Sequence, residues 1–172
     1  MNDIVFTKWV GLGETARLAR EQETILKERL PLSFIKRAAG LSEQLEKNED
    51  GRIAKIRGAD LIIPPGDKGI FGDLWLLAQE RDCGLDIFLK DIPVRQETIE
   101  ICEIFSKNPY ILPSEGALLI SIRDGHGLVY DLKKKNINAA VIGKETASKD
   151  RVIINGEDRR FLVPPERETY FE

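Results

Sequence analysis

The sequence predicts an α+β domain in which helices pack on a mixed β-sheet. Short runs rich in β-branched and apolar residues, such as 117–122, have the length and composition of buried strands. Longer segments, such as 68–81, repeat their apolar residues with the period of a helix. The two kinds of segment alternate irregularly, and we interpret the last strands as a meander. This order favours a mixed sheet over a regular parallel one.

The first half of the chain is expected to begin with a strand and to continue mainly with helices. Residues 4–9 are β-branched and aromatic, which is typical of a strand. A helix over 14–29 is expected to stop before Pro31, because proline disrupts a helix. A second helix starts near Ser33. The further elements expected are a helical turn at 52–57, a strand at 61–63 and a centrally buried helix at 68–81.

The second half is expected to hold more strands than helices. Gly84 suits the left-handed position after a helix, and Asp124 can cap the helix that follows it. The dipeptide Asn155-Gly156 is typical of a type I′ hairpin turn. The elements expected are strands 85–89, 117–122, 139–146, 151–154 and 160–163 and helices 95–105 and 126–135, before a charged tail at 163–172.

Length and composition describe one globular domain over residues 1–172. Of the 172 residues, 42% are hydrophobic and 32% are charged, and the net charge is −3. This balance excludes a strongly basic nucleic-acid footprint, and no apolar run approaches the roughly 18 residues of a membrane span. The first residues lack the pattern of a signal peptide, and two cysteines do not make a disulfide framework. We therefore expect a cytoplasmic protein that binds neither nucleic acid nor membrane.

The sequence offers few metal ligands and few common catalytic groups. One histidine, His126, and two cysteines 19 positions apart, Cys83 and Cys102, do not supply a zinc quartet of the usual spacing. Both cysteines are poor candidates for a nucleophile, since Cys102 belongs to an apolar helix face and Cys83 to a helix C-terminus. No metal site is expected, and catalysis would have to use carboxylates, lysines, hydroxyls or backbone amides.

Several motifs occur together in a specific order. They are DIVFTKWVGL at 3–12, GIFGDLW at 69–75, IPVRQETIEIC at 92–102, NPY at 108–110, SEGALLI at 114–120 and AVIG at 140–143. In this order and spacing they resemble the C-terminal half of the HypE family of hydrogenase maturation factors. That family belongs to the aminoimidazole-ribonucleotide (AIR) synthase-related, PurM-like superfamily. The resemblance covers nearly the whole chain.

The resemblance implies a PurM-like C-terminal domain without its N-terminal half. In the family the N-terminal half carries much of the ATP and Mg²⁺ site, and the C-terminal domain closes over the nucleotide with phosphate-facing loops. HypE proteins use ATP to dehydrate a carbamoyl group on a C-terminal cysteine, and the resulting thiocyanate supplies a cyanide ligand of hydrogenase. ATP and Mg²⁺ are thus implied only together with the N-terminal half. The implied partners are that half or other hydrogenase maturation proteins.

The chain departs from the family pattern at three places. It begins where the second half of the family begins. The family's His-Asp-x-Thr-x-Gly-Gly loop aligns with 63–69, where only an acid, Asp67, and Gly69 remain. The chain ends Thr169-Tyr170-Phe171-Glu172 and lacks the terminal cysteine that accepts the carbamoyl group. We therefore expect this chain alone to be inactive.

The first candidate site is the loop Gly66-Asp67-Lys68-Gly69. It precedes a helix whose first N–H groups favour an anion, and Lys68 adds a positive charge for a phosphate. The alternative is a plain turn with an exposed charge pair.

The second candidate site is Ser114-Glu115-Gly116, which precedes a strand. Ser114 can donate a hydrogen bond, Gly116 allows a ligand to approach closely, and Glu115 can act as a catalytic acid or base. By the resemblance, Glu115 matches a glutamate that faces the active cleft of HypE-like proteins. A solvated turn is the alternative. Thr15, at the start of the first long helix, either faces a nucleotide ligand or caps the helix.

Two functions stay open. In one, the chain contributes phosphate-facing loops to an ATP site that an N-terminal half completes. In the other, it is a non-catalytic binding or interaction module that kept the scaffold and lost the chemistry. A relative of thiamine-phosphate kinase or selenophosphate synthetase is a third option. A domain without the half that covers it should expose apolar surface, so we expect a homodimer or larger oligomer.

Overall fold

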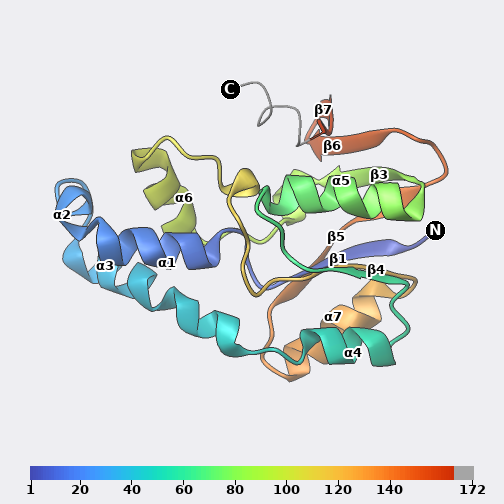
Figure 1. Ribbon diagram of the computed structural model, residues 1–172, viewed down its shortest axis with the longest axis horizontal. Helices are drawn as coiled ribbons and strands as arrows, with labels where there is room; N and C mark the ends of the chain where they lie inside the picture. Colours follow the sequence, from blue (N-terminus) through green and yellow to red (C-terminus); the bar gives the residue numbers. More distant parts are fainter. Residues whose placement is uncertain (165–172) are drawn as a thin grey trace.

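The computed structural model describes residues 1–164 as a seven-stranded sheet with helices on both faces (Figure 1). The strand order is β2-β4-β1-β5-β3-β6-β7, and all neighbours are antiparallel except β3 and β6, which are parallel. The strands are β1 (Asp3–Thr7), β2 (Leu61–Ile63), β3 (Gly84–Phe88), β4 (Leu119–Ile122), β5 (Ala139–Thr146), β6 (Arg151–Asn155) and β7 (Asp158–Phe161). The helices are α1 (Leu12–Glu21), α2 (Glu23–Leu26), α3 (Leu32–Ala39), α4 (Asp50–Ile56), α5 (Gly69–Arg81), α6 (Gln96–Ile104) and α7 (Gly125–Lys134), with 3₁₀ turns η1 (Gly40–Glu46), η2 (Leu89–Asp91) and η3 (Pro109–Ile111).

The helices form two layers on the sheet and a third group beside it. In Figure 1, α5 lies above the sheet, α4 and α7 lie below it, and α1, α2, α3 and α6 lie to the left. Strand β1 shows how the sequence requires both layers, because successive side chains of a strand point to opposite faces. Ile4 and Phe6 belong to the cluster under α5, whereas Val5 belongs to the cluster under α4 and α7. All three side chains are buried almost completely, so β1 is a central strand.

The predicted fold class is confirmed, but the predicted meander at the C-terminus is wrong. Strands β5 and β6 follow each other in sequence, yet β3 lies between them in the sheet. The two neighbours of β3 approach it closely, and a Cβ atom on Gly143 of β5 would lie 2.1 Å from the carbonyl oxygen of Asp86. Strands β6 and β7 do form the predicted hairpin, in which Asn155 pairs with Asp158.

Three local predictions also need correction. The helix predicted over 14–29 is divided at Gln22, whose φ of −114° lies outside the helical region, and α2 then buries Leu26 against α3 and α6. Asp82, with φ 48°, takes the left-handed position after α5, and Gly84 instead starts β3. In the β6–β7 turn only Gly156 has a positive φ, whereas a type I′ turn requires two such residues, so the predicted turn type is wrong.

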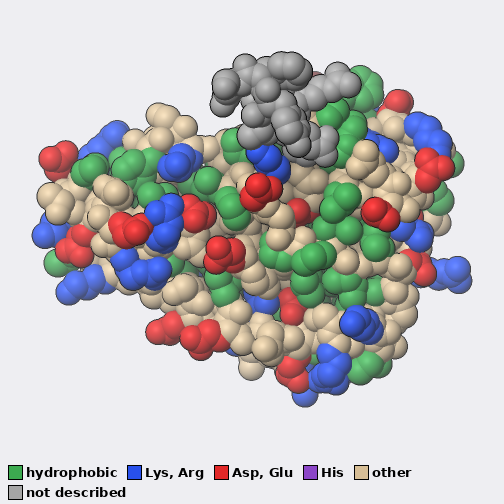
Figure 2. All heavy atoms as spheres, viewed as in Figure 1, with side chains coloured by type: hydrophobic (Ala, Val, Ile, Leu, Met, Phe, Trp, Pro, Cys, Tyr) green, Lys and Arg blue, Asp and Glu red, His purple; other side chains and the backbone are tan. Residues whose placement is uncertain are grey.

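The surface of the described part mixes both charges. Figure 2 shows acidic and basic side chains interspersed over the face that it presents. No helix within residues 1–164 is long and apolar enough to cross a membrane. Most of the charged tail predicted at 163–172 lies outside the described residues, which end at 164.

Candidate functional site

The segment 108–116 contacts the first predicted phosphate loop near its start and contains the second loop at its end. At the start of this segment, Asn108 caps η3 by accepting a hydrogen bond from the backbone N–H of Tyr110 at 3.0 Å. Turn η3 packs on α5, next to the first loop. At its end, the Ser114 hydroxyl accepts a hydrogen bond from the backbone N–H of Gly11 at 3.1 Å. The segment therefore ties the first loop, the second loop and the start of α1 into one region.

The first loop rests on this segment through Gly69. Gly69 has a φ of +72°, and a Cβ atom there would lie 2.6 Å from both the carbonyl carbon of Ile111 and the carbonyl oxygen of Tyr110. Both the left-handed backbone and the close contact require glycine. Gly69 therefore positions η3 against the start of α5 and is itself buried, whereas Gly66 and Asp67 are exposed and Lys68 is partly buried.

A buried carboxylate holds the other end of the first loop. Asp73 on α5 is only 5% exposed and accepts a hydrogen bond from the Gly66 backbone N–H at 3.0 Å. Burial raises the pKa of Asp73 to about 6, the Gly66 hydrogen bond opposes this rise, and the negative charge of Asp67 adds to it. Asp73 thus uses the N–H of Gly66, which is no longer available to a phosphate in this conformation.

The first loop also borders a cleft. The cleft has a volume of about 670 Å³ and lies between the start of α5, turn η3 and the end of the β6–β7 hairpin. Two of its rings, Phe71 and Tyr110, stack on each other with centroids 5.2 Å apart. Its lining is Asp67, Lys68, Phe71, Gly72, Leu89, Asn108, Tyr110, Ile111, Ile153, Arg160, Phe161, Leu162, Val163 and Pro164.

The second loop lies away from the cleft lining, at the other end of 108–116. Glu115 is exposed, and its carboxylate would lie 3.4 Å from a Cβ atom on Gly13, at the start of α1. No residue within 1–164 forms a hydrogen bond or an ion pair with the Glu115 carboxylate. Ser114 is fully buried, so its hydroxyl supports Gly11 and does not face solvent.

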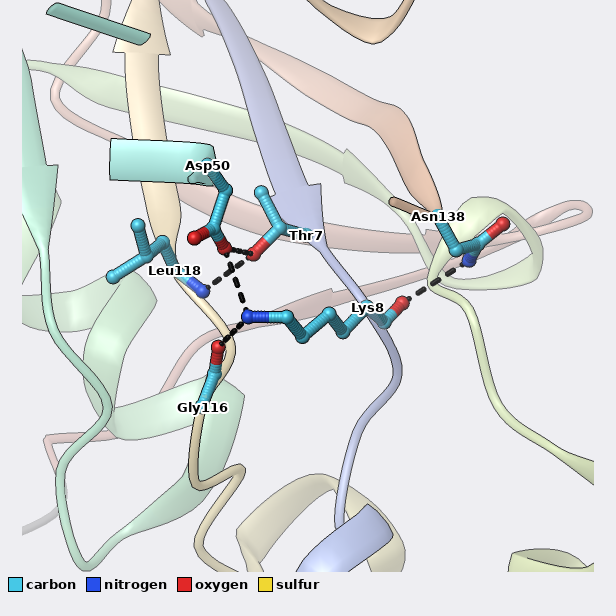
Figure 3. Close-up of polar contacts among 6 residues, drawn as sticks. All are labelled: Thr7, Lys8, Asp50, Gly116, Leu118 and Asn138. Carbon is cyan, nitrogen blue, oxygen red and sulfur yellow. Dashed lines mark hydrogen bonds and ion pairs between the residues drawn. The ribbon is translucent and has the colours of Figure 1, made fainter. Parts of the chain in front are cut away.

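A buried ion pair that the sequence did not reveal supports the second loop from inside (Figure 3). The Lys8 ammonium donates to the Asp50 carboxylate at 3.2 Å and to the carbonyl oxygen of Gly116. The Thr7 hydroxyl donates to the same Asp50 oxygen at 2.8 Å and accepts from the backbone N–H of Leu118 at 2.8 Å. Lys8 and Asp50 are 2% and 3% exposed. The pair therefore fixes the backbone on both sides of Ala117.

Lys8 also has an unusual backbone at the end of β1. Its φ is 64°, and its carbonyl oxygen accepts from the Asn138 side chain at 3.2 Å. A left-handed lysine is uncommon, so the surrounding contacts must hold it. Lysine is normally exposed, and Asp50 lies 42 positions away, so the sequence carried no local signal for this pair.

The other residues singled out in the sequence are Thr15, the two cysteines and His126. Thr15 is fully buried, and its hydroxyl donates to the Gly11 carbonyl oxygen at 2.7 Å and lies 2.9 Å from the Thr98 hydroxyl, within hydrogen-bond distance. Burial raises the pKa of Cys83 above its usual value and that of Cys102 to about 11, in agreement with the prediction that neither is a nucleophile. His126 lies exposed in the first turn of α7.

The side chains of the described residues can be compared with the ligands that Mg²⁺ prefers. Magnesium prefers oxygen ligands in an octahedral arrangement and is commonly held by one or two carboxylates together with phosphates. Within residues 1–164, no group of three or more histidine, cysteine, aspartate or glutamate side chains lies close enough to hold a metal ion. The described residues therefore do not fit a complete magnesium site.

Comparisons with known proteins support the fold. No protein-family model matches the chain, and no curated protein sequence matches it. Among solved structures, the HypE–HypF complex matches with 19% identity and a TM-score of 0.69, over 95% of this chain and 53% of that chain. HypE in complex with ATP matches with 15% identity and a TM-score of 0.68, over 94% and 50%. Thiamine-monophosphate kinase from Stenotrophomonas maltophilia matches with 13% identity and a TM-score of 0.63, over 91% and 50%.

These matches show that the chain has the fold of the matching parts of HypE and thiamine-monophosphate kinase. Nearly all of the chain takes part in each match. The chain spans about half the length of these solved chains.

Proposed function

We propose that this chain is one half of an ATP-using protein of the HypE type, and that a second half completes its nucleotide site. The observation that carries the proposal is the match of 95% of this chain to 53% of a HypE chain. A HypE structure with bound ATP has the same fold over a similar share of its length, which supports ATP as the cofactor. The match to HypE in complex with HypF supports hydrogenase maturation proteins as partners.

In this proposal the two loops face the nucleotide from one side. Lys68 supplies positive charge beside the start of α5, where the helix dipole also favours an anion. Gly69 and Gly66 shape the first loop through their contacts with η3 and Asp73. The second loop offers Glu115 as an acid or base, and the Lys8–Asp50 pair holds the Gly116 backbone that follows it.

Magnesium enters the proposal only with the second half. Because no group of three or more histidine, cysteine, aspartate or glutamate side chains within residues 1–164 could hold a metal ion, none of them is assigned as a magnesium ligand. Bound Mg²⁺ would neutralise phosphate charge in the assembled site. This chain's own contribution is to position the loops and to present the Glu115 carboxylate.

The experiment combines this chain with the half of a HypE protein that it does not match. ATP hydrolysis is measured for each part alone and for the mixture. The proposal expects turnover in the mixture only, and expects Glu115→Gln to abolish it. Glu103→Gln, an exposed glutamate on α6, is the matched control and should leave turnover unchanged. A mixture no more active than its parts would contradict the proposal.

One observation favours the alternative of a non-catalytic module. The hydroxyls of Ser114 and Thr15 are both buried and bonded within the protein, so two predicted ligand contacts serve the scaffold. The module would show no ATP turnover with any partner half. ATP turnover that disappears in Glu115→Gln would eliminate it.

Self-association stays a prediction. Several apolar side chains at the rim of the cleft are exposed, among them Ile111 at 53%, Phe161 at 71% and Val163 at 67%. Exposed apolar surface of this kind favours association. Sedimentation velocity at tens of micromolar measures the oligomeric state, and a clean monomer would contradict the expectation.

A further inference from the structure

We propose that the cleft between α5, η3 and the β6–β7 hairpin binds a small molecule that joins a planar ring to an anionic group. Small-molecule sites are typically clefts of about 300–1,000 Å³ with mostly apolar walls and a few polar groups. The volume of about 670 Å³ lies within this range. The ligand class follows from the chemistry of the walls and of the rim.

The walls fit a planar ring. Phe71 and Tyr110 line the cleft as a stacked pair, with an angle of 13° between their ring planes. Leu89, Ile153 and Leu162 add aliphatic surface. Aromatic rings prefer offset stacks with one another, so a flat ring gains more from these walls than a chain of similar size does.

The rim fits an anion. Lys68 and Arg160 line the cleft from opposite elements, the α5 loop and strand β7, and one carboxylate, Asp67, lies beside them. Arg160 lies 3.5 Å from the Asp158 carboxylate in an exposed pair, which contributes little and is easily exchanged for a ligand. Asn108 uses its side-chain oxygen to cap η3, so its NH₂ group can donate to a ligand. Within residues 1–164 the rim thus presents two cations and an amide donor, with the carboxylates of Asp67 and Asp158 beside them.

The role of the ligand rests on the proposed function. The cleft borders the same loop that we place at the nucleotide phosphates, so a molecule in the cleft would lie next to the ATP site. We therefore assign it as the second substrate of the assembled protein. Binding to the cleft itself needs neither ATP nor the second half, so the two proposals can fail separately.

The test measures binding of three probes to the full 172-residue chain by titration calorimetry, without ATP. The probes are 1-naphthyl phosphate, 1-naphthol and inorganic phosphate, which present the ring and the anion together, the ring alone and the anion alone. We expect 1-naphthyl phosphate to bind at least about tenfold more tightly than either fragment, because the walls and the rim act together. Equal affinity for naphthol and naphthyl phosphate would overturn the proposal.

Two neighbouring arginines provide a matched control. Arg159 and Arg160 are both exposed neighbours on β7, but of the two only Arg160 lines the cleft. Arg160→Gln should weaken naphthyl phosphate binding about threefold to tenfold, whereas Arg159→Gln should not change it. Phe161→Ser removes an exposed cleft side chain and should weaken naphthyl phosphate and naphthol alike. Equal losses in the two arginine variants would refute a site at the cleft.

A further variant tests whether the chain's own end is the occupant. The chain continues from Pro164, which lines the cleft, through eight more residues. A chain that stops after Pro164 should bind naphthyl phosphate at least as tightly as the full chain. Loss of binding in this shorter chain would show that the cleft depends on residues 165–172 and would overturn the proposal as stated.

Discussion

Asp50 and Asp73 are buried to nearly the same extent, at 3% and 5% exposure, and each anchors one of the two candidate loops. Asp50 receives the Lys8 ammonium and the Thr7 hydroxyl, and the same ammonium holds Gly116 in the second loop. Asp73 receives a single backbone N–H, from Gly66 in the first loop, and has the negative Asp67 nearby. The two carboxylates therefore differ in their partners and not in their burial.

The comparison indicates that the two loops respond differently to change. Removing one partner of a buried charge pair strongly destabilises the folded protein, because the other charge stays buried without compensation. A buried carboxylate without a cationic partner instead takes up a proton at a higher pH. The second loop should therefore depend on the intact pair, and the first loop should depend on pH.

The largest effect is expected when the pair around Asp50 is broken. Lys8→Met keeps most of the side-chain volume but leaves Asp50 buried with only the Thr7 hydroxyl. We expect a loss of about 3–5 kcal/mol in the free energy of unfolding, measured by urea denaturation at pH 7. Lys55→Met changes an exposed lysine on α4, the helix that begins at Asp50, and should alter stability by no more than about 0.5 kcal/mol. A loss under about 1 kcal/mol for Lys8→Met would mean that the pair is not what holds this loop.

The first loop has its own sensitive position at Gly69. A Gly69→Ala variant must place a Cβ atom 2.6 Å from the Ile111 and Tyr110 backbone while it keeps a φ of +72°. We expect a loss of about 2–4 kcal/mol of stability and weaker binding of naphthyl phosphate, because η3 must move away from α5. Gly40→Ala is the control, since its added Cβ meets nothing within 4 Å. Equal free energies of unfolding for the two alanine variants would show that the close contact of Gly69 with η3 does not constrain this position.

The sequence predicted the helices and strands of this fold much better than it predicted which of them lie side by side. Apolar spacing was sufficient for α5 and for β4, and the side chain of Asp124 caps α7 as its position predicted. These features depend on neighbours within a few positions in the chain. The place of β3 between β5 and β6 depends on pairings across more than 50 positions, which no local pattern contains.

The same distinction holds for the candidate site, where local features could be predicted and contacts between distant residues could not. The glycines and the exposed acid of each loop could be identified from turn chemistry, and the structure places Lys68 of the first loop in the lining of the cleft. The buried role of Ser114 could not be predicted, because its partner Gly11 lies 103 positions away, and the contact of Thr15 with Thr98 likewise spans 83 positions. The anchors Asp50 and Asp73 were missed because an aspartate in a helix is normally exposed.

A pH-dependent effect of intermediate size is expected at Asp73. Since the pKa of Asp73 rises from 3.8 to about 6 on folding, the folded protein holds a proton that the unfolded chain releases between these values. Asp73 therefore reduces stability as pH rises through this range, by up to about 3 kcal/mol above pH 6. Asp73→Asn stays neutral and should be more stable than the parent chain at pH 8, and about equally stable at pH 3.5.

The measurement is the difference in unfolding free energy between the Asp73→Asn variant and the parent chain at the two pH values. Carboxylates that are common to both proteins cancel in this difference. Asp91→Asn, an exposed aspartate in η2, serves as the control and should give a small difference at both pH values. A difference that does not change between pH 3.5 and pH 8 would show that Asp73 has no raised pKa.

The smallest effect is expected at Asp67, which connects the buried anchor to the cleft. Its charge contributes to the raised pKa of Asp73 and also lies on the cleft rim with Lys68 and Arg160. Asp67→Asn should lower the pKa of Asp73, as measured by a ¹³C NMR titration of its carboxyl carbon, and should tighten naphthyl phosphate binding about twofold. Both changes should shrink in 1 M salt, where the screening length falls to about 3 Å, because Asp67 is exposed. If the Asp73 pKa moves while probe binding does not, the anion lies away from Asp67, and the rim of the cleft must be assigned to Arg160 and Asn108 alone.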